Sequence, residues 1–90
     1  MLYQLNMADG GIVSVSMAGV GLQGDLWIHA HGLTVAECAR IFSDPQKTNR
    51  MYIIYDETIS DTFEGYTELF SISTCDDFVR VGIGKGAENA

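Results

Sequence analysis

The chain has little of three things: proline, positive charge and cysteine. One proline stands among 90 residues, five lysines and arginines are set against twelve acidic residues, and the two cysteines are Cys38 and Cys75. Scarce proline and an apolar content of 47% exclude a disordered chain. A chain of this length buries one thin core, so we expect a single domain over residues 1–90.

The lack of positive charge also limits the class of partner. A net charge of −7 disfavours binding to nucleic acid or to an anionic membrane, and it favours a partner with a basic surface. No apolar run approaches the ~20 residues of a membrane span, and the first residues lack the charged and apolar regions of a signal peptide. We therefore expect a cytoplasmic protein with both cysteines reduced.

Residues 33–45 carry the signals of a helix. Thr34 is a good N-cap, and Glu37 completes a capping box with it. Pro45 disfavours helix in the residue before it and ends the helix. The apolar stripe predicted to face the core consists of Val35, Cys38, Ala39 and Phe42, with Ile41 at its margin. So short a helix is unstable alone in water, so we expect it to lie on a sheet.

Runs of alternating or β-branched residues predict strands on both sides of this helix. The predicted strands are residues 2–8, 12–17, 26–31, 51–55, 63–73 and 78–83. Asp9-Gly10-Gly11 predicts a hairpin between the first two, Gly65 predicts a bulge in the fifth, and residues 84–90 are expected to be a frayed tail.

The order of elements is therefore three strands, one helix and three strands. Short connections favour antiparallel pairing, because parallel neighbours need a crossover. The expected fold is α+β and mainly antiparallel β, with about six strands forming a curved sheet or a small barrel on which one helix packs.

Residues 19–24, Gly-Val-Gly-Leu-Gln-Gly, match the letters of a dinucleotide-binding glycine motif. That motif needs a helix directly after it, whose N-terminal amides hold the pyrophosphate. Residues 25–29 alternate like a strand instead, so we interpret the glycine-rich stretch as a flexible loop.

Trp27, His29 and His31 are predicted to share one face of a strand, because residues two apart point the same way. Two imidazoles so placed can share a metal ion, for which Asp25 would be a third ligand in the same register. The alternatives are a surface for protein contact and an ordinary polar sheet face. No cluster with established metal-ligand spacing supports the metal hypothesis.

Acidic side chains dominate the second half of the chain. Between Met51 and Val79 there are seven acids and no lysine or arginine; the acids are Asp56, Glu57, Asp61, Glu64, Glu68, Asp76 and Asp77. Nothing marks two of them as an acid and base pair, and their spacing is not that of an EF-hand. They fit a solvated acidic face or a docking site for a basic partner. No activated nucleophile is present either, so we expect no enzyme and no cofactor.

Two stretches resemble a known group of proteins. Residues 33–37, Leu-Thr-Val-Ala-Glu, leading to residues 42–45, Phe-Ser-Asp-Pro, and residues 63–69, Phe-Glu-Gly-Tyr-Thr-Glu-Leu, resemble short uncharacterised proteins from prophage and phage structural-gene regions of Gram-positive bacteria. The resemblance implies a small non-enzymatic part of a virion or of its assembly, and it carries no residue roles.

The leading hypothesis is a non-enzymatic interaction or assembly module that self-associates or binds other assembly proteins. Its strands carry more aromatic side chains than a core this thin can bury, so an interface should cover some of them. The predicted contact residues are Trp27, His29, His31, Glu64, Tyr66 and Glu68. The alternative hypothesis is a small ligand- or metal-binding protein that uses Trp27, His29 and His31.

Overall fold

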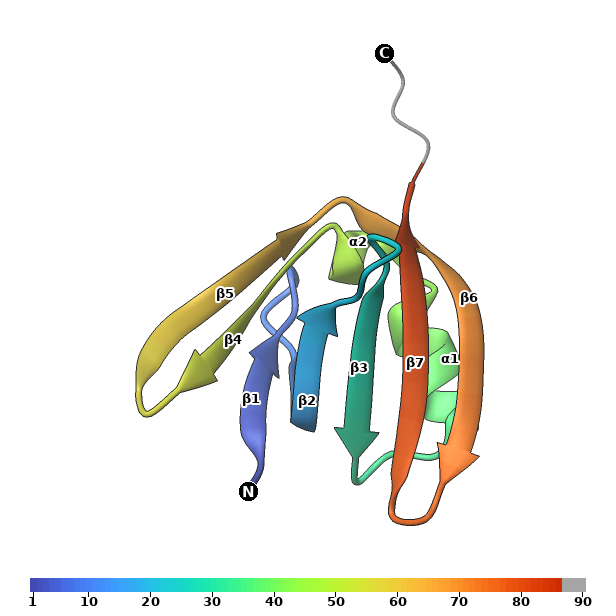
Figure 1. The fold of residues 1–90 in the computed structure, drawn as a ribbon, viewed down its shortest axis with the longest axis horizontal. Coiled ribbons are helices and arrows are strands. Elements are labelled where there is room, and N and C mark those ends of the chain that lie inside the picture. Colours follow the sequence, from blue (N-terminus) through green and yellow to red (C-terminus); the bar gives the residue numbers. More distant parts are fainter. Residues whose placement is uncertain (87–90) are drawn as a thin grey trace.

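The computed structural model shows one curved antiparallel sheet with two short helices on one of its faces (Figure 1). The structure describes residues 1–86, the side chain of Ser60 excepted. The strands in this range are β1 (Tyr3–Asn6), β2 (Ile12–Val20), β3 (Leu26–His31), β4 (Arg50–Tyr55), β5 (Thr58–Glu64), β6 (Tyr66–Cys75) and β7 (Phe78–Lys85). The helices are α1 (Val35–Phe42) and α2 (Pro45–Thr48). The predicted α+β class is confirmed.

The sheet is open, with strand order β5-β4-β1-β2-β3-β7-β6. All strand pairs within residues 1–86 are antiparallel, including the predicted hairpin of β1 and β2. The barrel alternative is wrong, because the edge strands β5 and β6 are joined in sequence at Gly65 rather than paired along their length. At that corner the Gly65 N–H donates to the Asn49 carbonyl (2.9 Å), and the Gly86 N–H donates to the Gly65 carbonyl (3.0 Å).

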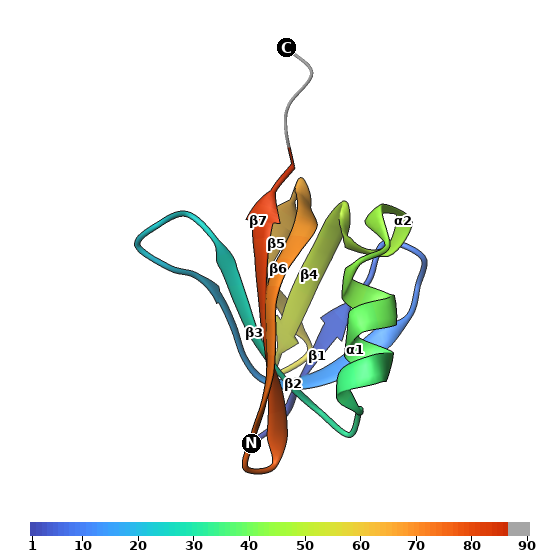
Figure 2. The same ribbon diagram turned by 90° about the vertical axis from the view of Figure 1, so that its right-hand side faces the viewer.

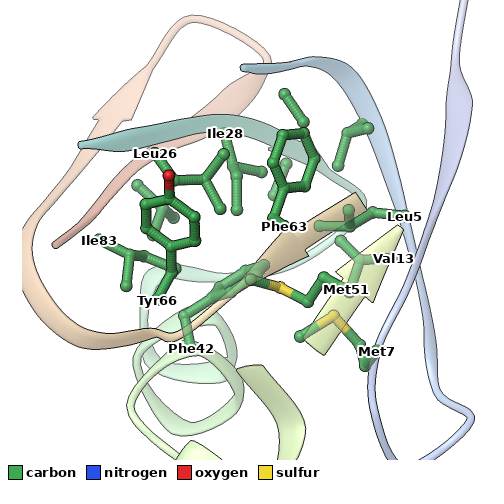
Figure 3. Close-up of a cluster of buried hydrophobic side chains, with 14 of the residues drawn as sticks. Leu5, Met7, Val13, Leu26, Ile28, Phe42, Met51, Phe63, Tyr66 and Ile83 are labelled. Atoms are coloured by element: carbon green, nitrogen blue, oxygen red, sulfur yellow. The ribbon is translucent and has the colours of Figure 1, made fainter. Parts of the chain in front are cut away.

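Alternation along each strand separates an inner face from an outer face. The helices cover the inner face, as Figure 2 shows, and the core lies between them and the sheet. The fully buried inner residues of the strands are Leu5, Val15, Leu26, Ile28, Ala30, Met51, Ile53, Val81 and Ile83. Figure 3 shows Phe42 extending from α1 toward this cluster. The outer face carries no helix within the described residues.

The capping box at the start of α1 is confirmed. The Glu37 N–H donates to Thr34 Oγ1 (3.1 Å), and the Thr34 N–H donates to Glu37 Oε1 (2.9 Å). Cys38 and Phe42 are fully buried, whereas Val35 is exposed at the margin of the stripe. Burial raises the pKa of the Cys38 thiol, and the neighbouring Glu37 adds to the rise. This part of the sequence therefore packs as predicted, except at Val35.

The prediction of one helix is wrong, because Pro45 starts a second one. Asp44 is the N-cap of α2 and accepts a hydrogen bond from the Gln46 N–H (3.0 Å). Proline fits the first helical position, where its missing N–H is not needed.

Neither helix of the described range, residues 1–86, has the length and apolar character of a membrane span.

Three strand predictions also need correction. The predicted strand 63–73 is two strands, since Gly65 has a φ of 82° and makes a turn rather than a bulge. Residues 58–62, for which no strand was predicted, form β5 (Thr58–Glu64) together with the next two residues and raise the count to seven strands in the described range. β7 continues to Lys85, so the predicted tail at residues 84–90 is wrong there; its last four residues, 87–90, lie outside the described residues.

Candidate functional site

The outer surface of β3, β7 and β6 gathers aromatic and imidazole rings around one arginine. Trp27 stands opposite Gly82 and His29 opposite Arg80 in the pairing of β3 with β7, so the predicted face of β3 meets an equivalent face of β7. A shift in register between Leu69 and Ser71 marks a β-bulge at Phe70 on the neighbouring strand β6. We call this surface the outer aromatic face; its residues are Trp27, His29, His31, Phe70, Phe78 and Arg80.

Trp27 is the centre of the outer aromatic face. The guanidinium carbon of Arg80 lies 4.0 Å from the centroid of the Trp27 ring, which is the geometry of a cation–π contact. The Phe70 ring approaches Trp27 edge to face, with centroids 5.5 Å apart. Arg80 is exposed and makes no ion pair among the residues described. The guanidinium of Arg80 therefore packs on the Trp27 ring and forms no ion pair with a carboxylate in residues 1–86.

Gly82 makes room for this arrangement. A Cβ atom at Gly82 would lie 2.6 Å from the Trp27 ring and 3.1 Å from the Phe70 ring. Glycine is unfavourable in the middle of a strand unless another group approaches the backbone closely. The Trp27 ring therefore lies directly on the backbone of β7.

The two histidines belong to the same surface. The His29 ring stacks on Phe78 with centroids 4.3 Å apart, and His31 Nε2 lies 2.8 Å from the Ser16 hydroxyl. Burial lowers the pKa of His29, and the nearby charges of Arg80 and His31 lower it further. His29 is therefore neutral at pH 7 and packs as a ring.

The candidate metal ligands of the alternative hypothesis are not brought together as a set of three. Within residues 1–86 no group of three or more His, Cys, Asp and Glu side chains is placed to hold a metal ion, so Asp25 does not complete a set with His29 and His31. The glycine-rich stretch is a loop only over residues 21–25, because Gly19 and Val20 belong to β2. The loop leads directly into β3, so no helix follows it as a dinucleotide-binding motif requires.

A shallow hollow of about 450 Å³ adjoins Trp27. Its lining residues are Met17, Gly19, Val20, Gly21, Trp27, His29 and Arg80. Val20, which lines the hollow, is 50% exposed, and Phe70, which contacts Trp27, is 54% exposed. Leu22 in the β2–β3 loop is fully exposed. The outer aromatic face thus combines exposed apolar surface with one fixed cation.

The other predicted contact residues lie elsewhere. Tyr66 is only 6% exposed and packs in the core against Phe63, as Figure 3 shows, so its predicted role in contact is wrong. Glu64 and Glu68 are exposed on the edge strands β5 and β6. The other five acids between Met51 and Val79 are also exposed. Asp56 and Glu57 lie in the β4–β5 turn, Asp61 lies in β5, and Asp76 and Asp77 lie in the β6–β7 turn.

No family model, no curated protein and no solved structure matches this chain. Within residues 1–86, the outer aromatic face places the exposed ring of Phe70 and the half-buried ring of Trp27 beside Arg80, whose charge has no ion-pair partner in that range. Tryptophan and arginine are the residue types that contribute most to the affinity of protein interfaces. The outer aromatic face therefore brings together residue types that are common among the hot spots of protein interfaces.

Proposed function

We propose that this chain is a non-enzymatic assembly module that self-associates through its outer aromatic face. The observation that carries the proposal is the Arg80–Trp27–Phe70 cluster, in which a cation and two rings are held together at the surface. Side chains already fixed by their neighbours lose less conformational entropy on binding. The surface is therefore preorganised for binding.

The support beneath this cluster favours the same function. Trp27 and Arg80 stand on β3 and β7, which pair along five residue positions, and the alternate residues of both strands are buried in the core. Contact residues on strands are positioned more accurately than contact residues on loops. The surface is therefore rigid enough to recognise a partner of defined shape.

The resemblance of residues 33–45 and 63–69 to prophage structural proteins agrees with an assembly role. Copies of a virion component must bind one another or their neighbours through complementary surfaces, which is the property proposed for the outer aromatic face. A role in a virion or in its assembly stays a prediction.

Sedimentation velocity at concentrations from low micromolar to submillimolar tests self-association. We expect the wild type to shift to larger species as its concentration rises. Arg80→Glu should weaken association about tenfold or more, because it places a carboxylate against Trp27. Arg40→Glu is the matched control, since Arg40 is an exposed residue of α1 on the opposite side of the sheet. A wild-type chain that stays monomeric throughout would overturn the proposal.

A small anionic ligand at the same hollow is the second candidate function. The volume of about 450 Å³ falls within the range of known ligand sites, and Arg80 would supply the charge for a carboxylate. Benzoate is a suitable probe, because it is flat and anionic. Saturable quenching of the fluorescence of Trp27, the one tryptophan of the chain, would support this candidate if Arg80→Gln abolishes it.

A further inference from the structure

We infer that the occupant of the outer aromatic face is the β4–β5 hairpin of a second copy, so that copies join head to tail. We call residues 50–64 the acidic hairpin. The inference rests on the proposed function and adds to it the identity of the partner surface. It is carried by charge, by exposed apolar side chains and by the shape of the hairpin turn.

The charges of the two surfaces are opposite. The acidic hairpin carries Asp56, Glu57, Asp61 and Glu64, all of them exposed, and its single basic residue, Arg50, is at the end far from the turn. The outer aromatic face carries Arg80 without an ion-pair partner among the described residues. A carboxylate from the turn would neutralise that guanidinium and could bind it through two hydrogen bonds.

The apolar parts of the two surfaces also match. On the acidic hairpin Ile59 is 59% exposed, and Leu2 is exposed beside the turn, where it lines a hollow together with Asp56 and Glu57. On the outer aromatic face, exposed Val20 lines the hollow together with Arg80, and exposed Phe70 packs against Trp27, which also lines the hollow. Each surface thus places apolar side chains beside charge of one sign, and the signs are opposite.

The turn of the acidic hairpin is unusual in sequence. Asp56 and Glu57 have φ values of 47° and 64°, so both adopt the left-handed conformation of a tight two-residue turn. That turn strongly prefers glycine, and non-glycine residues in this conformation carry strain. The turn places two exposed carboxylates next to each other at the tip of the hairpin. A tip of two residues presents both carboxylates together to the hollow beside Trp27 of a second copy.

The hairpin and the outer aromatic face of one copy cannot meet. β1 and β2 lie between β4 and β3 in the sheet, so the acidic hairpin leaves the sheet on one side and the outer aromatic face lies toward the other (Figure 1). Contact therefore needs two copies that use different surfaces. When each copy binds its hairpin to one neighbour and its outer aromatic face to another, the association is heterologous, and it closes into a ring or continues as a filament.

A charge-swap series in the full chain tests this inference by sedimentation velocity. The three variants are Arg80→Glu, the hairpin variant Asp56→Asn/Glu57→Lys, and their combination. Asparagine tolerates the left-handed conformation at residue 56. The matched control is Asp76→Asn/Asp77→Lys, which makes the same charge change in the exposed β6–β7 turn. Thermal melts confirm that each variant is folded.

We expect the first two variants each to weaken association about tenfold or more, and the control to behave as the wild type. The combined variant should recover association to within about threefold of the wild type, because the charges are exchanged and remain complementary. If the hairpin variant associates like the wild type while Arg80→Glu does not, the head-to-tail inference fails and the proposed function survives with another contact. If the wild type never associates, both fail.

Discussion

The two faces of β3 are built from alternate residues of the same six-residue strand, and they differ in chemistry. Leu26, Ile28 and Ala30 point inward and are fully buried, whereas Trp27 and His29 point outward and are half-buried by other rings. The inner face is aliphatic and is closed by α1. The outer face is aromatic and lacks a helix to cover it within the described residues. The comparison separates the residues that hold the fold from those available to a partner.

The largest expected effect comes from breaking the inner face. Phe42→Ala should lower the free energy of unfolding by about 3 kcal/mol, because Phe42 is fully buried and truncation leaves a cavity under α1. Urea denaturation measures this change. Val35→Ala on the same helix should cost under ~1 kcal/mol, since Val35 is exposed. A loss from Trp27→Ala larger than the loss from Phe42→Ala would reverse the assignment of the two faces.

Gly82→Ala should disturb the packing of Trp27 on the outer aromatic face, because Gly82 lies under the Trp27 ring. Its added methyl group would meet the Trp27 ring at 2.6 Å, so we expect the ring to be displaced at a cost of about 1 to 2 kcal/mol. The emission of Trp27 should shift to longer wavelength as the ring is pushed into solvent. Gly19→Ala is the control, because Gly19 also pairs with Trp27 but has free space for a methyl group. Unchanged emission in Gly82→Ala would contradict the packing described.

Asn6→Val tests the outer side of the sheet at β1, away from the outer aromatic face. The Nδ2 atom of Asn6 is buried and has no hydrogen-bond partner among the described residues. Removing an unsatisfied buried donor should raise the free energy of unfolding by about 1 kcal/mol, with valine packing between Ile12 and Tyr52 on the paired strands. Gln4→Val, an exposed position on the same strand, should change stability by less than ~0.5 kcal/mol. A destabilised Asn6→Val would show that the amide is satisfied in solution.

The smallest effect is the pH dependence due to His29. Burial, Arg80 and His31 keep its folded pKa below the ordinary value of 6.5, so the unfolded state binds more protons between the two values. The stability that His29 contributes in its neutral form is fully present above pH 6.5, and it is lost as the pH falls through the pKa of His29 in the folded state. The urea midpoint of the wild type should therefore drop more between pH 7.5 and pH 5 than that of His29→Gln. Equal drops would show that His29 is not packed as described.

Much of the inner face could be predicted from local signals. Alternation of apolar residues located most of the strands, and the capping box at Thr34 located the start of α1. The prediction is wrong at one glycine and one proline, because each of these residue types occurs in two different local structures. Gly65 fits a bulge as well as a turn, and Pro45 ends one helix while it starts another. Tyr66 is predicted at the surface because the core was judged too thin for all the aromatic side chains, whereas it is only 6% exposed.

The outer aromatic face could be predicted only in part. Trp27, His29 and His31 share a face because of the two-residue period of a single strand, which the sequence contains. Arg80, Phe78 and Gly82 join them through the pairing of β3 with β7, which are distant in sequence. Phe70 enters through a bulge. Glycines alternating with Val81 and Ile83 were an available signal, because such glycines on one side of a strand indicate that another group lies close to the backbone.

Acrylamide quenching of Trp27, measured as a function of protein concentration, tests the central claim most directly. If the outer aromatic face is covered when copies associate, the quenching constant should fall as the concentration rises, with the same midpoint as the growth of species seen by sedimentation. Arg80→Glu should keep the high quenching constant over the same range. A wild-type constant that does not change while larger species form would show that the copies meet through another surface.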